Sequence, residues 1–363
     1  MKTLILRTTL LIALFSILGS SFCHAQVRYI DAQELTLTGK NLPTSHHYHR
    51  IDTADYKGFS KYENIQVRCP AGLAIAFTTS STRIDVKAEY GPFVYNGAGT
   101  TRIAHEGFDL YIRRGGEWVY ASSLAPKARG TNLTLVNNMN SEPKECLLYL
   151  PNYSEILDLQ IGVDESSTIE PLENPFRHKI VIFGSSFTHG IGTSRSGMSY
   201  PMQIARNTGL EFCSIACSGN CKMQPYFAAY LADIQEVDAF VFDAFSNPSA
   251  DMIRERLNPF IETLRSSHPH TPLIFVQTIN REICNFDQAK AKDEAQKQAA
   301  AVEMMKVAMA QFDDLYFIDS KGFTGDDHIS SADGVHPSDL GYMRWANALQ
   351  PKLLKILKKY GIK

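Results

Sequence analysis

Hydrophobic and polar positions follow a different rhythm in each half of the chain. In the first half, short segments rich in β-branched and aromatic residues are separated by turns such as Gly115-Gly116 and Asn137-Asn138. Many short strands without intervening helices are typical of an antiparallel sandwich. We expect strands over residues 73–79, 83–90, 108–113, 118–122, 132–136 and 145–150.

In the second half, short apolar runs alternate with longer helical stretches. Strands are expected over 179–183, 212–216, 239–242, 273–277 and 315–318, and helices over 200–208, 251–266, 288–311 and 339–359. Apolar strands that alternate with helices indicate an α/β fold, with a parallel sheet covered on both faces. Such a sheet places its functional groups at the carboxyl ends of its strands.

The first residues have the pattern of an export signal. Lys2 and Arg7 supply positive charge, 8–18 is apolar, and Cys23-His24-Ala25 ends on a small residue. The alternative is a short membrane anchor, but this stretch is too short to span a bilayer, and no later segment is long enough. We therefore expect a cleaved signal peptide over 1–25 and a secreted or periplasmic protein without a membrane span.

The change of rhythm also predicts the domain boundaries. An N-terminal β-sandwich domain is expected over 26–165, a linker with Pro171 and Pro175 over 166–177, and a second domain over 178–363. The net charge of the 363 residues is −2 and the Lys and Arg residues are scattered, which argues against a nucleic-acid partner.

Three cysteines, Cys213, Cys217 and Cys221, are evenly spaced and have the residue type of metal ligands. We favour small buried residues instead, because no matching Cys/His pair lies at the spacing of a zinc site. Only six cysteines follow residue 25, too few for a disulfide scaffold, although an exported protein can form one or two bridges.

A serine, a histidine and a carboxylate occur at expected strand ends. Gly184-Ser185-Ser186 follows the first apolar strand, and Asp333-Gly-Val-His336-Pro337 follows the last. A histidine can deprotonate a serine hydroxyl, and a carboxylate can fix the imidazole tautomer, so these groups suit acyl transfer. Either Ser185 or Ser186 can be the nucleophile, and a serine here alone would more commonly be a helix cap.

An acyl-transfer site also needs donors for the oxyanion that develops on the substrate. The N–H of the nucleophile is one candidate. The N–H of Gly219, after the second strand, and the amide of Asn247, after the third, are the others. No Gly-x-Ser-x-Gly elbow surrounds Ser186, which argues against an α/β-hydrolase.

Four motifs together resemble a known family. Gly184-Ser185-Ser186, Ser218-Gly219-Asn220, Ser246-Asn247-Pro248 and Asp333-Gly-Val-His336-Pro337 are similar, in order, to the four blocks of SGNH (GDSL-type) hydrolases. Gly107-Phe108-Asp109-Leu110-Tyr111 resembles the GxDLY-type β domain that precedes some bacterial members. The resemblance implies a flavodoxin-like three-layer hydrolase domain after a jelly-roll-like antiparallel β-sandwich.

The resemblance also implies residue roles. Ser186 would be the nucleophile, His336 the general base and Asp333 its orienting carboxylate, with Ser186 N–H, Gly219 and Asn247 as the oxyanion hole. Two positions depart from the family pattern, because Ser185 and Pro248 stand where an aspartate is common. Neither replaced group is one of the three reacting residues.

The expected function is an exported serine esterase that needs no metal or cofactor. An acylated carbohydrate would be its substrate, losing acetyl or other small acyl groups. A lipase or general carboxylesterase for longer acyl chains is the closest alternative. Acyl transfer onto sugars, and a glycan-binding surface protein with an inactive hydrolase domain, are two others.

Several other residues have two interpretations each. His46-His47-Tyr48-His49 and Asp326-Asp327-His328 are expected in loops rather than at a metal or second catalytic site. His189 would line the pocket or lie exposed in a turn, and Asp243 would approach the pocket or cap a loop. The aromatic residues of two expected strands would form sandwich core, which we favour, or a sugar-stacking platform: Tyr111, Trp118 and Tyr120.

Overall fold

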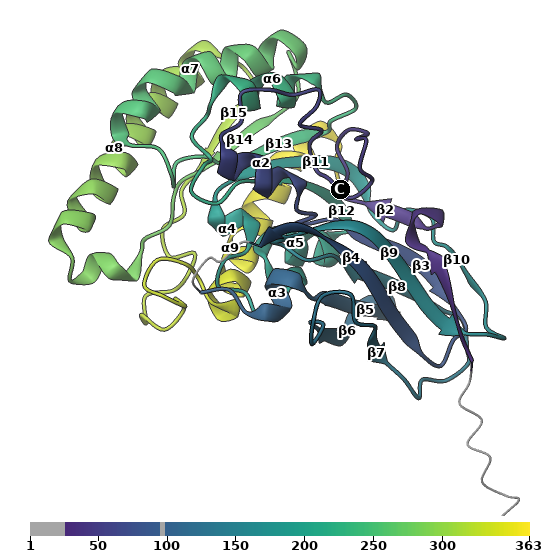
Figure 1. Ribbon diagram of the computed structural model, residues 1–363. Coiled ribbons are helices and arrows are strands. Elements are labelled where there is room, and N and C mark those ends of the chain that lie inside the picture. Colours follow the sequence, from purple (N-terminus) through teal and green to yellow (C-terminus); the bar gives the residue numbers. More distant parts are fainter. Residues whose placement is uncertain (1–25, 95–98) are drawn as a thin grey trace, which may run out of the picture.

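The computed structural model describes residues 26–94 and 99–363 of the chain, so the export signal expected in 1–25 lies outside the described residues. Two antiparallel sheets form from the first half of the chain and one parallel sheet from the second (Figure 1). Within the described ranges, no helix combines the length and apolar character needed to cross a membrane.

The first half forms a β-sandwich, as the spacing of its strands predicts. One sheet has the order β1 (Val27–Asp31), β9 (Ser154–Asp164), β4 (Ile84–Val94) and β7 (Leu133–Val136). The other has the order β10 (Ile169–Pro171), β3 (Ala74–Thr79), β8 (Lys144–Tyr149), β5 (Phe108–Arg114) and β6 (Glu117–Leu124), with β2 (Thr36–Thr38) also paired to β3. The segment expected as a linker, 166–177, thus carries β10, which pairs with β3.

The second half forms a parallel sheet with the order β12 (Leu210–Ala216), β11 (Arg177–Gly184), β13 (Ala239–Asp243), β14 (Leu273–Val276) and β15 (Leu315–Ile318). This 2-1-3-4-5 order is that of flavodoxin-like folds, in which the switch in strand order beside the first strand opens a crevice for ligands. The predicted α/β fold is confirmed.

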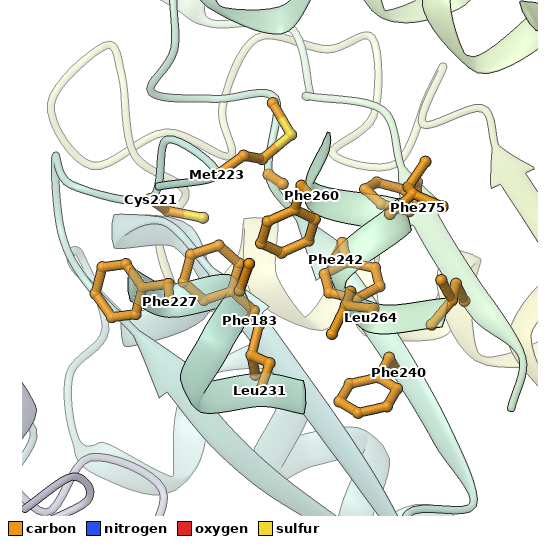
Figure 2. Packing of buried hydrophobic residues seen from close by; sticks show 14 of the residues in the cluster. Phe183, Cys221, Met223, Phe227, Leu231, Phe240, Phe242, Phe260, Leu264 and Phe275 are labelled. Atoms are coloured by element: carbon orange, nitrogen blue, oxygen red, sulfur yellow. The ribbon is translucent and has the colours of Figure 1, made fainter. Parts of the chain in front are cut away.

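Helices cover both faces of the parallel sheet. α5 (Tyr200–Thr208) and α9 (Asp339–Leu357) pack on one face, and α6 (Pro225–Asp233), α7 (Ala250–Ser267) and α8 (Gln288–Gln311) on the other. Side chains of β11 alternate between the two: Val181 and Phe183 join the α6–α8 side, Ile180 and Ile182 the α5–α9 side. Figure 2 shows Phe183 among Phe227, Phe260 and other apolar side chains of the cluster on the α6–α8 side of the sheet.

The two halves of the chain share apolar cores. In β3, Ile75 and Phe77 point into the sandwich, whereas Ala74 and Ala76 pack in one cluster with Met202 and other residues of α5. The short helix α2 (Lys61–Arg68) also packs against the second half of the chain, because its Val67 is buried in the apolar cluster with α6, α7 and α8. Two further short helices are α3 (Arg102–Glu106) and α4 (Ser186–His189).

Candidate active site

Strand register brings three of the predicted motifs to one edge of the parallel sheet. Gly184, the last residue of β11, is paired with Ala216 of β12 on one side and Asp243 of β13 on the other. The chain segments that follow these strands therefore leave the sheet next to one another. A backbone hydrogen bond of 2.9 Å from Cys217 to the carbonyl of Gly184 ties two of them together.

The predicted serine, histidine and carboxylate meet at this edge. The Nε2 atom of His336 lies 2.9 Å from Oγ of Ser186, and its Nδ1 lies 2.8 Å from Oδ2 of Asp333. Nδ1–H donates to the carboxylate, which leaves Nε2 as the acceptor for the serine hydroxyl. Residues 150 positions apart in the chain thus form one line of hydrogen bonds along which a proton can move.

The loop of residues 333–336 also fixes the carboxylate. Oδ1 of Asp333 accepts hydrogen bonds from the N–H groups of Val335 (2.9 Å) and His336 (2.7 Å). Partial burial works to raise the pKa of Asp333, but the hydrogen bonds from the backbone and ring of His336 outweigh it and lower that pKa. The carboxylate is therefore ionised at neutral pH and can stabilise an imidazolium.

Ser185 and Ser186 have different surroundings. Ser185 is fully buried, its Oγ donates to Oδ2 of Asp243 (2.6 Å), and it caps α4 by accepting from the N–H of Phe187. Ser186 is 7% exposed and is the one bonded to His336. The geometry favours Ser186 as the nucleophile.

Asp243 lies next to the residue that precedes Ser186, and it also caps the loop that follows β13. Its carboxylate accepts from both N–H and Oγ of Ser185, and from the hydroxyls of Thr188 and Ser246. Burial raises the pKa of Asp243, and these hydrogen bonds partly oppose the rise. Asp243 thus binds the segment before the nucleophile to the segment before Asn247.

The candidate oxyanion donors lie in neighbouring segments. Oδ1 of Asn247 accepts the N–H of Cys221 (3.1 Å), so the carbonyl end of this amide is engaged and its NH₂ is turned elsewhere. In the described part of the chain, neither this NH₂ group nor the N–H of Gly219 has a hydrogen-bond acceptor. Gly219 is exposed and has φ +73°, a conformation that suits glycine.

His189 differs from both sequence interpretations, because it is buried and neither lines an open pocket nor lies in an exposed turn. Its Nε2 lies 2.8 Å from the carbonyl of Asn152, and its ring stacks on Tyr153 at 4.1 Å. Burial, reinforced by the charge of Arg50, lowers the pKa of His189 well below its usual value. The ring is therefore neutral.

The aromatic residues of β5 and β6 face the hydrolase half. Tyr111 is buried, with the guanidinium of Arg206 4.0 Å from its ring centre, and Trp118 is half-buried. Tyr120 is 47% exposed but lies under Arg195 at 4.3 Å. These three rings therefore do not form a shared open platform for a sugar. The prediction that they form sandwich core is also wrong, because Tyr111 and Trp118 pack in the cluster shared with α5 and α9 and Tyr120 is exposed.

Asp109 of the GxDLY-like motif explains part of this contact. It is fully buried, pairs with Arg195 at 3.3 Å, and accepts the N–H of Gly197 at 2.9 Å. Burial raises the pKa of Asp109 to about 6 against the opposing charge of Arg195. The motif thus joins the sandwich to the segment between α4 and α5.

The remaining candidate metal residues behave as expected from packing. Cys213, Cys217 and Cys221 are buried free thiols. His46-His47-Tyr48-His49 lies in a loop, where His49 pairs with Glu155 at 2.8 Å, and 326–328 is an exposed loop. Among residues 26–94 and 99–363, no group of three or more His, Cys, Asp or Glu side chains is arranged to hold a metal ion.

Comparisons with known proteins agree with this site. Residues 177–354 match the model of the GDSL-like lipase/acylhydrolase family, and residues 27–169 match that of the N-terminus of SGNH-hydrolase-type esterases. A crystal structure described as a GDSL-like lipase from Bacteroides ovatus is 42% identical, with 92% of this chain and 98% of that chain covered and a TM-score of 0.89. The chain belongs to the GDSL-like lipase/acylhydrolase family. It is therefore a hydrolase of ester bonds.

More distant structures share the two-part fold. A salicylyl-acyltransferase of a tetracycline biosynthetic pathway is 19% identical, with 91% and 97% of the two chains covered and a TM-score of 0.71. A family two carbohydrate esterase from Cellvibrio japonicus is 14% identical, with 92% and 98% covered and a TM-score of 0.62. A comparison with curated protein sequences finds no match.

Proposed function

We propose that this family member is an exported serine esterase that removes acetyl or other small acyl groups from glycans through a covalent acyl-enzyme. The observation that carries the catalytic part is the line of hydrogen bonds from Asp333 through His336 to Ser186. Ser186 is the nucleophile, His336 the general base and Asp333 the carboxylate that orients it. Ser186 N–H, Gly219 and Asn247 are the oxyanion donors.

The groups of this site account for each proton transfer in the catalytic cycle. Nε2 of His336 takes the Ser186 proton while Oγ attacks the ester carbonyl, and the oxyanion donors hold the negative oxygen. The tetrahedral intermediate collapses when the imidazolium gives its proton to the leaving alcohol. Water, deprotonated by the same imidazole, then attacks the acyl-enzyme and releases the acid and free Ser186.

The substrate proposal is supported by the openness of the site. The side chains of His336 and Asp333 are 17% and 32% exposed, and Gly219 is also exposed, so a bulky alcohol such as a glycan can approach. Structural neighbours include carbohydrate esterases of family two. Export fits a polymeric substrate outside the cell, and the signal predicted in 1–25 supports it.

A Ser186→Ala variant tests the catalytic assignment. Acetate release from acetylated xylan and from other acetylated glycans is expected to fall by about 10³-fold or more, because the acyl-enzyme cannot form. An unchanged thermal unfolding temperature is the control for folding. A variant that keeps its activity would remove Ser186 from the mechanism.

A chain-length series tests the substrate class. On p-nitrophenyl esters, the acetate is expected to give a kcat/KM at least about tenfold above the octanoate. Each added methylene gains about 1 kcal/mol only where an apolar pocket accepts it, and an enzyme for small acyl groups excludes the longer chain. A preference for octanoate would favour the lipase alternative. Acyl transfer would appear as acylated acceptor sugar in place of free acetate.

A further inference from the structure

Ser218, the residue before Gly219, is held at every polar atom. Its N–H donates to Oε1 of Gln66 at 2.5 Å, and its carbonyl accepts from Nε2 of the same side chain at 3.0 Å. The carbonyl also accepts from the side chain of Asn220 at 2.9 Å. Its hydroxyl lies 2.8 Å from the hydroxyl of Tyr153 and 3.2 Å from Nδ1 of His189. These hydrogen bonds together fix the position of Ser218.

Two of these partners come from the N-terminal half of the chain. Gln66 lies on α2 and is 2% exposed, and Tyr153 lies between β8 and β9 and is fully buried. A buried primary amide that meets both the N–H and the C=O of one residue makes two hydrogen bonds to it, one as acceptor and one as donor, at a fixed angle. Gln66 therefore fixes the peptide groups on both sides of Ser218, the second of which carries the N–H of Gly219.

The direction of the second set of hydrogen bonds follows from the chemistry of the groups. The carbonyl of Asn152 only accepts, so Nε2 of His189 carries the proton and Nδ1 accepts from the Ser218 hydroxyl. The Tyr153 hydroxyl then donates to Ser218. Ser186 begins α4 and His189 ends it. These hydrogen bonds therefore join both α4 and the Gly219 segment to Asn152 and Tyr153 of the sandwich.

The N-terminal half also comes close to the catalytic loop at Gly99. A Cβ atom added to Gly99, in the segment between β4 and α3, would lie 3.1 Å from Oδ2 of Asp333. The N-terminal half thus approaches the carboxylate as well as the oxyanion donors.

We propose that the N-terminal half is a working part of the esterase site, with Gln66 and Tyr153 as positioning residues that set the Gly219 N–H for the oxyanion. This inference rests on the proposed function, because it assumes that Gly219 binds the oxyanion formed at Ser186. Neither side chain touches the reacting atoms; each acts through Ser218.

Gln66→Met and Tyr153→Phe test the proposal, since each keeps the shape and removes only hydrogen bonds. We expect kcat on p-nitrophenyl acetate to fall about tenfold or more in Gln66→Met and about threefold in Tyr153→Phe, with KM within about twofold, because a misplaced donor weakens only the transition state. The rate at which a p-nitrophenyl alkylphosphonate modifies Ser186 should fall by the same factors. Both are measured well below each variant's unfolding temperature.

Glu211→Met is the matched control. Oε1 of Glu211 accepts the N–H of Gly39 at 2.9 Å, a contact between the same two halves but at the start of β12, away from Ser218. This variant is expected to lose thermal stability while it keeps the wild-type kcat and phosphonate rate. If Gln66→Met does not fold, Tyr153→Phe alone decides.

Two outcomes separate this inference from the proposed function. Wild-type kcat and phosphonate rates in both positioning variants, with Ser186→Ala inactive, would overturn the inference alone. Full activity in Ser186→Ala would overturn the proposed function. Equal losses of kcat in Glu211→Met and Gln66→Met would reduce Gln66 to a general contact between the halves.

Discussion

The segments after β12 and β13 carry the two outer oxyanion donors that we propose, Gly219 and Asn247, and they are fixed in different ways. Residues 217–221 are held from the N-terminal half, through Gln66 and Tyr153. Residues 244–248 are held from within the hydrolase half, where Nη2 of Arg281 donates to the carbonyl of Ser246 at 2.7 Å. Two donors that must meet one oxygen thus depend on two separate parts of the chain.

Arg281 is itself firmly placed. Its Nη1 pairs with Glu294 of α8 at 2.8 Å, and its guanidinium lies 5.5 Å from the ring centre of Phe187, next to the nucleophile. Among the residues that the structure describes, one hydrogen bond joins the two donor segments: the N–H of Cys221 donates to Oδ1 of Asn247. The backbone before Asn247 is thus held by Arg281 of the hydrolase half, whereas residues 217–221 are held by Gln66 and Tyr153 of the N-terminal half. We therefore expect Asn247 to depend less on the docked sandwich than Gly219 does.

Removal of the Asn247 amide is expected to have the largest effect. Asn247→Ala should lower kcat about 10²- to 10³-fold on p-nitrophenyl acetate with little change in KM, as for loss of one oxyanion donor. Asn258→Ala, which removes an amide bonded to Gln311 between α7 and α8, serves as the control. A wild-type kcat in Asn247→Ala would leave the N–H of Gly219 as the only outer oxyanion donor and would contradict the role proposed for Asn247.

A smaller effect is expected from loss of the Arg281 support. Arg281→Met should lower kcat about tenfold, because Ser246 loses its donor while the Asn247 amide is still present. Arg281→Lys keeps the charge but lacks the planar fork whose two Nη groups reach Ser246 and Glu294, and its kcat should lie between those of the wild type and Arg281→Met. If stability falls and kcat stays, Arg281 only supports α8.

The last expected effect is on stability rather than on catalysis, and it comes from the buried Asp109 where the sandwich meets the hydrolase half. The pKa of Asp109 is raised to about 6, so between about pH 4 and 6 the folded chain holds a proton that the unfolded chain releases. Unfolding free energy therefore decreases as the pH rises through this window. Relative to Asp109→Asn, the wild type should lose up to roughly 3 kcal/mol from pH 4 to 7 in urea unfolding. Parallel pH curves for the two proteins would contradict this.

The parallel sheet could be predicted well from the sequence. The expected strand 315–318 and helices 200–208 and 288–311 coincide with β15, α5 and α8. Strands buried on both faces are continuous apolar runs, and long helices alternate with them, so both periods are distinct. The motifs followed these strands, which is why Ser186, Asp333 and His336 could be selected together.

The contacts between the halves could not be predicted. α2 reads as a polar segment, and β9 alternates with charged residues, so neither had a strong pattern. Gln66 and His189 are polar side chains buried by a partner from elsewhere in the chain, and no local spacing distinguishes them from surface residues. The one available signal was the GxDLY-like motif, whose Asp109 and Tyr111 form part of the interface.

Peptide mass spectrometry can identify the residue that carries the acyl group, which we propose is Ser186. The enzyme is mixed with excess p-nitrophenyl acetate, quenched in acid within the first turnovers, digested and fragmented. We expect an acetyl group on Ser186, absent in Ser186→Ala and reduced in His336→Ala. An acetyl group on Ser185, or none on the peptide of residues 178–195 while substrate is turned over, would contradict it.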